Sequence, residues 1–123
     1  MGRYRGLTLR VLGRETPAIG PGKAELIERI ARTGSISAAA RAMGMSYRRA
    51  WLLVDALNED FAELVVATAA GGRRGGGASV TAFGSALTVR FRAMERKASA
   101  AIATDLQYFA RLLKSSSRRR KTR

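Results

Sequence analysis

One stretch of the sequence constrains the fold more than any other: GSISAAARAMGMSYRRAWLLVDALN, residues 34–58. Its Ala-rich part, Ala38–Met43, predicts a short helix whose small side chains let another helix approach closely. Gly44 ends that helix in a tight turn, and Ser46 can cap a second, longer helix over residues 47–59. Two helices joined by a short glycine-containing turn are the layout of a helix-turn-helix.

The residues before this stretch predict a strand, a loop and a helix. Alternating apolar and polar residues in Leu7–Leu12 predict a strand with one buried face. The segment 13–22 holds both prolines and is expected to be a loop. From Lys23 an apolar stripe at helical spacing predicts a helix, which Gly34 should end as a C-cap.

After the helix pair the sequence predicts a hairpin followed by a long helix. The apolar segments 64–68 and 78–81 flank the sequence GGRRGGG, residues 71–77, as two strands joined by a glycine-rich turn would. Apolar residues then recur through positions 83–113, with no Pro or Gly after Gly84. A continuous helix of about 30 residues would be roughly 45 Å long.

This order of elements predicts an α+β, mainly helical fold, a winged helix-turn-helix with a β-hairpin wing and a long C-terminal dimerisation helix. We expect a DNA-binding domain over 1–81, the long helix over 82–114, and a disordered basic tail over 115–123. The helix is too long for the small domain to cover, so we expect a two-fold homodimer in which each helix packs against its mate. The predicted interface residues are Leu87, Phe91, Met94, Ile102, Leu106 and Phe109.

The composition favours a polyanionic partner and argues against common enzyme chemistry. The 123 residues carry 23 Lys and Arg against 9 Asp and Glu, a net charge of +14, and a nucleic acid or an anionic membrane would relieve the self-repulsion. Without Cys or His the chain lacks disulfides, thiolate zinc ligands and the usual general base. We expect no catalytic residue, no metal and no cofactor. No apolar run approaches the roughly 18 residues of a membrane span, and no signal peptide is evident, so a soluble cytoplasmic protein at the nucleoid is expected.

The sequence GGRRGGG has three possible interpretations. In a wing, its glycines would let the backbone approach DNA closely, while Arg73 and Arg74 pair with phosphates or enter a narrow minor groove. It could also be an inert flexible loop. A nucleotide-binding loop is the third possibility, although a P-loop requires a lysine followed by Ser or Thr and a helix directly after it.

The helix pair supplies the other candidate DNA contacts. Residues that open the second helix of such a motif meet base edges and phosphates in the major groove, while the first helix crosses the backbone. Tyr47 could touch a phosphate or pack against Trp51, which we expect in the core. Ser37 is predicted to cap the first helix and to lie near a phosphate. The predicted DNA-binding residues are Ser37, Arg41, Ser46, Tyr47, Arg48, Arg49, Arg73 and Arg74.

The sequence resembles the DNA-binding domain of ModE-type, molybdate-responsive bacterial regulators. The resemblance rests on residues 34–58, on GGRRGGGASVTAFG at residues 71–84 and on GPGK at residues 20–23, within a match over about residues 7–113. The first helix of the pair also resembles that of the more distant LysR-type regulators. The resemblance implies that the protein binds double-stranded DNA and forms a homodimer. Family members carry molybdate-binding domains after the long helix, where this sequence continues into a basic segment, so any small-molecule effector stays unknown.

Two other functions are open at this point. A low-specificity architectural protein of the nucleoid would suit the high charge and the basic tail. A nucleotide-dependent enzyme built on the glycine loop is the alternative from another class, and the missing His, Cys and P-loop lysine argue against it.

Overall fold

Helices and two small hairpins make up the chain, which a computed structural model describes for residues 6–69 and 77–114. Arg73, Arg74 and the segment 115–123 lie outside the described residues. The elements in chain order are β1 (Val11–Leu12), β2 (Pro17–Ile19), α1 (Pro21–Thr33), α2 (Ile36–Met43), α3 (Tyr47–Asp60), β3 (Val66–Ala69), β4 (Gly77–Val80), α4 (Ala82–Ala101) and α5 (Ala103–Leu112). The predicted mainly helical winged helix-turn-helix with a β-hairpin wing is confirmed.

Helix α1 is the centre of the core. It starts at Pro21, two residues earlier than predicted, because a proline at the first helical position has a suitable φ and no amide hydrogen to satisfy. It ends at Gly34, whose φ of 71° lies in the left-handed region that glycine adopts without strain. Leu26, Ile27 and Ile30 are fully buried and pack against α2, α3 and α4.

Two antiparallel hairpins flank the helices. β1 and β2 pair Val11 with Ile19, so the predicted strand at the N-terminus is short and its partner forms in the segment predicted to be a loop. β3 and β4 pair in register from Val66↔Val80 to Ala69↔Gly77 and form the wing. Both strands lie within a residue or two of their predicted positions.

The single long helix predicted over 82–114 is wrong, because the chain forms two helices instead. The backbone departs from helical geometry at Ile102, with φ −116° and ψ 26°, and α5 starts at the next residue. Ile102 and Thr104 are β-branched and weaken helix propensity at this point. α5 has no buried residue, so packing within the described chain does not hold the two helices in line.

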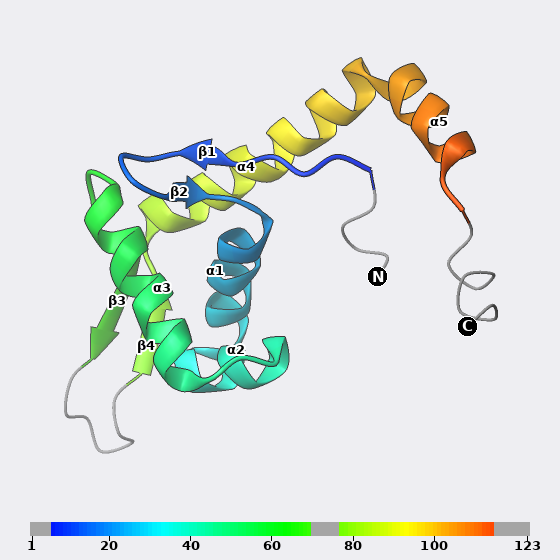
Figure 1. The fold of residues 1–123 in the computed structure, drawn as a ribbon. Coiled ribbons are helices and arrows are strands. Elements are labelled where there is room, and N and C mark those ends of the chain that lie inside the picture. Colours follow the sequence, from blue (N-terminus) through cyan, green and yellow to red (C-terminus); the bar gives the residue numbers. More distant parts are fainter. Residues whose placement is uncertain (1–5, 70–76, 115–123) are drawn as a thin grey trace.

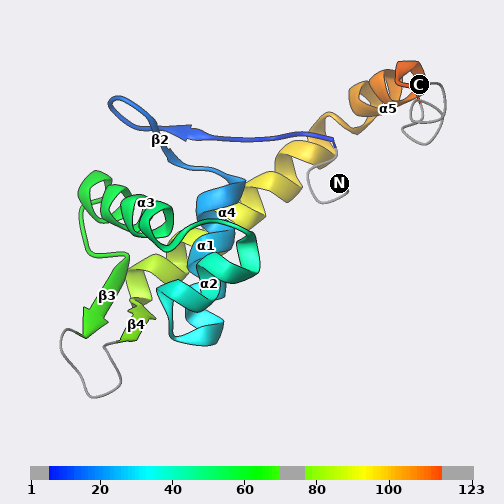
Figure 2. The ribbon, with the colours of Figure 1, turned by 60° about the horizontal axis from the view of Figure 1, so that its bottom comes forward.

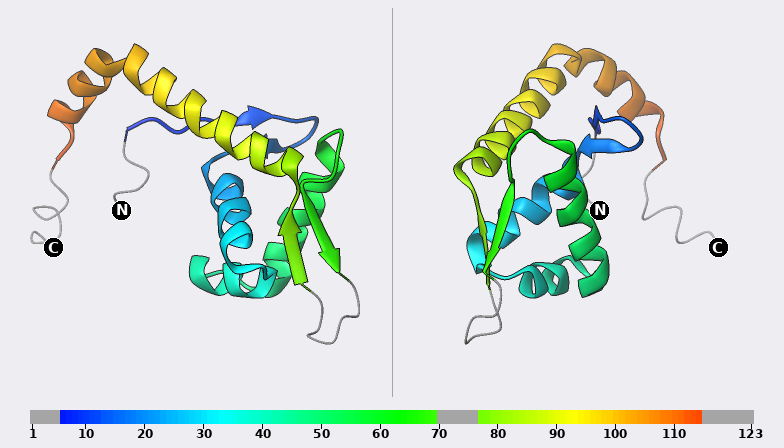
Figure 3. Two further views of the ribbon diagram at one scale, coloured as in Figure 1. Left: turned by 180° about the vertical axis from the view of Figure 1, so that it is seen from behind. Right: turned by 90° about the vertical axis from the view of Figure 1, so that its left-hand side faces the viewer.

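Helix α4 runs across the top of the molecule and carries α5 away from the other helices (Figure 1). The view from the opposite side shows the same separation, with α5 at one end of α4 and the β3–β4 hairpin at the other (Figure 3). The start of α4 is part of the core, since Gly84, Thr88 and Phe91 are buried. Among the described residues, no helix is both long enough and apolar enough to cross a bilayer.

Candidate nucleic-acid interface

The turn between α2 and α3 has the backbone geometry of a Schellman C-cap. Gly44 has φ 70°, its N–H donates to Arg41 O at 3.1 Å, and Met45 N–H donates to Ala40 O at 3.0 Å. These bonds satisfy carbonyls that the end of a helix leaves without partners. They also turn the chain, so that α3 starts three residues after Gly44 and packs against α2 (Figure 2).

Ser46 fixes the start of α3 and therefore which residues lie in its first turn. Its hydroxyl oxygen accepts a hydrogen bond from Arg49 N–H at 3.0 Å, as predicted for an N-cap. Arg48 and Arg49 follow in that turn with exposed side chains, and neither forms an ion pair with another described residue. Two exposed guanidinium groups thus lie at the positively polarised end of the helix.

Helix α2 starts two residues earlier than predicted, and its N-cap is Ser35 rather than Ser37. The hydroxyl oxygen of Ser35 accepts from Ala38 N–H at 3.0 Å. Ile36 is then the first helical residue and its side chain is buried in the core. Ser37 lies inside the first turn and is half-buried, while Arg41 is exposed in the last turn.

Tyr47 packs against Trp51 one turn along α3, as one of the two alternatives for this side chain predicted, and its contact with a phosphate stays a prediction. The ring centroids are 6.3 Å apart at an interplanar angle of 82°, an edge-to-face arrangement. Trp51 is half-buried against the core, whereas Tyr47 is 54% exposed. The phenol therefore remains accessible beside Arg48.

The wing is attached to the helices through both of its strands. Asn58, in the last turn of α3, forms three hydrogen bonds with the backbone of Val65 and Val66 at the start of β3. On the other strand, Ala78 N–H donates to Gly34 O at 3.0 Å. The two strands run toward the end of the molecule where α2 lies (Figures 1 and 3).

The charges along α3 are separated. Arg48 and Arg49 lie at its N-terminal end, and the exposed carboxylates of Asp55, Glu59 and Asp60 lie on its second half. These carboxylates and the β1–β2 turn, which includes Arg14 and Glu15, line a hollow of about 730 Å³. Within the described chain no cluster of three or more His, Cys, Asp or Glu side chains could hold a metal ion.

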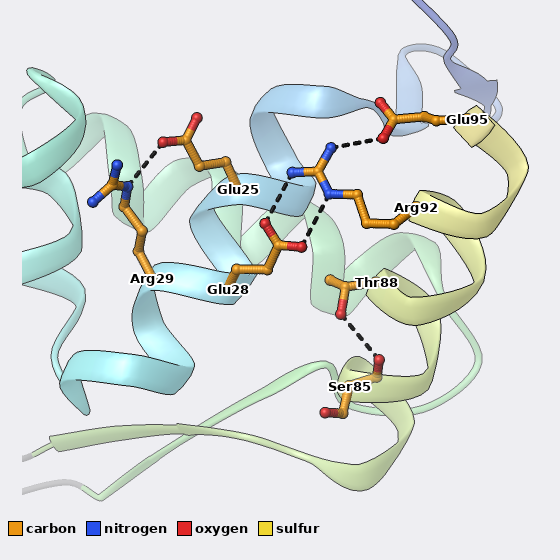
Figure 4. Close-up of polar contacts among 7 residues, drawn as sticks. All are labelled: Glu25, Glu28, Arg29, Ser85, Thr88, Arg92 and Glu95. Atoms are coloured by element: carbon orange, nitrogen blue, oxygen red, sulfur yellow. Dashed lines mark hydrogen bonds and ion pairs between the residues drawn. The ribbon is translucent and has the colours of Figure 1, made fainter. Parts of the chain in front are cut away.

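An ion-pair cluster joins α4 to α1 (Figure 4). The Arg92 guanidinium donates from Nε and Nη2 to both carboxylate oxygens of Glu28, at 3.0 and 2.9 Å, and from Nη1 to Glu95 at 2.9 Å. These hydrogen bonds, those to Glu28 first, raise the pKa of Arg92 above its ordinary value although partial burial opposes the shift. A bidentate contact of this kind fixes both distance and orientation.

The six predicted interface residues divide into two groups. Phe91 is 2% exposed within the core of its own chain, so its side chain cannot form the predicted dimer contact, and Leu87 packs partly against the same core. Met94, Ile102 and Leu106 are half-buried, and Phe109 is 58% exposed. Exposed apolar side chains gather on α5 and just after it: Tyr108, Phe109, Leu112 and Leu113.

These elements define a winged helix-turn-helix of the kind found in regulatory DNA-binding proteins. The sequence model of the bacterial regulatory helix-turn-helix proteins of the LysR family matches residues 22–85. The chain belongs to this family.

Its relatives confirm the resemblance to ModE-type regulators. The molybdenum-pterin-binding protein MopA of Rhodobacter capsulatus is 46% identical over 79 residues, 64% of this chain and 30% of MopA. The molybdenum transport protein ModE of Azotobacter vinelandii is 34% identical over 111 residues, 81% of this chain and 41% of that protein. The DNA-binding transcriptional dual regulator ModE of Escherichia coli K12 is 39% identical over 67 residues, 54% of this chain and 26% of that protein. The matched part thus spans less than half the length of each relative.

Sequence reasoning missed Asn58 and Arg92. Asn58 has a recognisable signal, because asparagine favours side-chain bonds to nearby backbone over a helix interior. Arg92 has none, since its partner Glu28 is distant in sequence and the chain has many other arginines.

Proposed function

We propose that the protein is a sequence-specific transcriptional regulator of the ModE type that binds palindromic double-stranded DNA as a homodimer. Each protomer would place the N-terminal end of α3 in a major groove and its wing against the flanking backbone. Residues 1–81 and the first turns of α4 would form the DNA-binding head, and the rest of 82–114 the dimer contact.

The observation that carries this proposal is the pair of exposed guanidinium groups in the first turn of α3. Arginine is the side chain that most often reads guanine, through its O6 and N7 atoms in the major groove. Arg48 and Arg49 have no competing carboxylate among the described residues, and Ser46 lies beside them at a helix N-terminus suited to a phosphate. Arg41 in the last turn of α2 and Tyr47 in the first turn of α3 are also exposed.

The wing contact and the homodimer in this proposal rest on the β3–β4 hairpin and on α5. Arg73 and Arg74 belong to the segment that connects β3 to β4, so they would reach the DNA backbone on the wing side. The exposed apolar side chains of α5 supply a surface that a second copy would cover. Two heads on one two-fold axis would recognise half-sites about one or more helical turns apart.

Selection of bound DNA from a random pool tests the proposal. We expect an enriched sequence with two-fold symmetry, and its half-site spacing would give the separation of the two α3 helices. Titration of that DNA against random competitor gives the specificity ratio. A ratio of about 10³ or more supports a regulator, and a ratio near one would instead indicate an architectural protein, which the net charge of +14 would suit.

A further inference from the structure

Asn58 connects helix α3 to the wing through both polar atoms of its carboxamide, Oδ1 and Nδ2. Its Oδ1 accepts from Val65 N–H at 2.8 Å and from Val66 N–H at 3.1 Å, and its Nδ2 donates to Val66 O at 3.0 Å. One side chain thus forms hydrogen bonds with the backbone of two consecutive residues where the chain enters β3. Three bonds from a planar group fix the direction of that strand as well as its distance.

The surroundings of these bonds leave the backbone of Val65 and Val66 few other partners. Val65 and Val66 are 0% and 1% exposed, so water does not readily replace Asn58. Val65 O is already bonded, since it accepts from Thr81 N–H at 3.0 Å. The same threonine caps α4 through Gly84 N–H, so the end of α3, the base of the wing and the start of α4 meet at this point.

From this geometry we propose that Asn58 is a positioning residue for DNA binding, which holds the wing at a fixed angle to α3. The inference rests on the proposed function. With the angle fixed, Arg48 and Arg49 can enter the groove while the wing lies on the DNA backbone. Binding then does not have to include the entropy cost of orienting the wing relative to α3. Asn58 itself lies at the opposite end of α3 from Arg48, so in this proposal it would act without contacting DNA.

A double-mutant cycle between Asn58 and the wing tests the inference. Asn58→Leu keeps a similar volume and removes all three hydrogen bonds. In the native background, replacing Arg73 and Arg74 with alanine is expected to weaken binding about tenfold or more. In the Asn58→Leu background the same wing substitutions should weaken binding by less than about threefold, because a wing that is no longer held in position contributes less to binding. A difference of this size is within the range of coupling between interacting residues. The matching cycle with Arg48→Ala should be additive.

Two controls separate positioning from stability. Ile27→Val destabilises the core but leaves the three Asn58 hydrogen bonds in place, and the wing substitutions should keep their full effect in that background. Asn58→Asp keeps the acceptor oxygen and loses the donor, so it should give an intermediate coupling and serves the same cycle if the leucine variant does not fold. Circular dichroism checks the fold of each variant.

The outcomes distinguish the inference from the function it rests on. If the native chain binds DNA and Arg48→Ala weakens it, but the wing substitutions cost the same factor with and without Asn58, the positioning proposal is wrong and the regulator proposal stands. If the native chain shows no preference for the selected DNA, the proposed function itself fails, and Asn58 with it.

Discussion

Arg48 and Arg49 occupy the first turn of α3 because of the residue that precedes them. The Ser46 hydroxyl replaces an intrahelical partner for Arg49 N–H, so the helix begins immediately after it. Successive helical residues are about 100° apart, so the two guanidinium groups cover neighbouring sectors of the same end. Each can therefore reach a different base or phosphate.

Arg48→Ala or Arg49→Ala should relax or abolish sequence preference. A base-contacting arginine contributes about 1–3 kcal/mol of discrimination, and this is lost with the side chain. Competition binding with the selected site and with single-base variants measures the effect. Equal loss of affinity for every sequence would show that the residue contacts phosphate rather than a base.

Gly84 allows α4 to lie directly on the base of the wing. A β-carbon at this position would clash with Val65 O and lie 2.9 Å from Val80 Cγ1. We expect Gly84→Ala to destabilise the protein by about 1–3 kcal/mol, because overpacking outweighs the gain of up to about 1 kcal/mol in helix propensity. Urea unfolding measures the change. Gly22→Ala is the control, since a β-carbon added there would meet no other atom within 4 Å, and it should be neutral or stabilising.

At the scale of the elements, hydrophobic spacing and cap residues located α1, α3, β3 and β4 to within about two residues. The errors arise where tertiary packing decides. Ser35 and Ser37 are both suitable caps in the sequence, and the buried Ile36 selects the first. At Ile102 the β-branched residues weaken the helix only slightly, and the absence of buried residues on α5, which the sequence pattern does not reveal, leaves the break unopposed. For the site, the residues in the first turn of α3 could be placed from the motif alone, and Asn58 has a local signal. The Arg92–Glu28 contact joins segments that only the fold brings together.

The Arg92 cluster sets the position of α4 on α1, and its removal should have a small, salt-dependent cost. Arg92 and Glu28 are each about one third exposed, so solvent screens the pair and Arg92→Met should cost about 0.5–1 kcal/mol. Unfolding in low salt and in 1 M NaCl should show a smaller difference in high salt. Arg96→Met provides the control, because Arg96 is exposed and forms no ion pair with another described residue.

The wing arginines should affect affinity rather than specificity. Arg73→Ala with Arg74→Ala is expected to weaken binding to all sequences by a similar factor and to reduce the slope of log K against log salt by up to about two. Binding isotherms at several salt concentrations give both quantities. Unchanged affinity and slope would mean that this segment does not contact DNA.

For the whole molecule, two phenylalanines have different expected roles: Phe91 lies in the core, and Phe109 lies on the proposed dimer surface. Phe109→Glu places a charge on the exposed face of α5 and should shift the protein from dimer to monomer with little loss of fold. Phe91→Ala removes a buried core side chain and should cost about 3–5 kcal/mol of stability. Sedimentation equilibrium and urea unfolding measure the two effects. A native chain that is monomeric at all concentrations would contradict the homodimer.

The separation of charge along α3 gives the head a polarity that acts before contact with DNA. Roughly 16 Å of helix separate Arg48 from Glu59, so a head that drifts toward a polyanion experiences a torque as well as an attraction. The torque turns the arginines forward and the carboxylates of Asp55, Glu59 and Asp60 away. Most encounters would then begin with the recognition helix facing the duplex, and non-productive orientations would be rejected by repulsion during the approach.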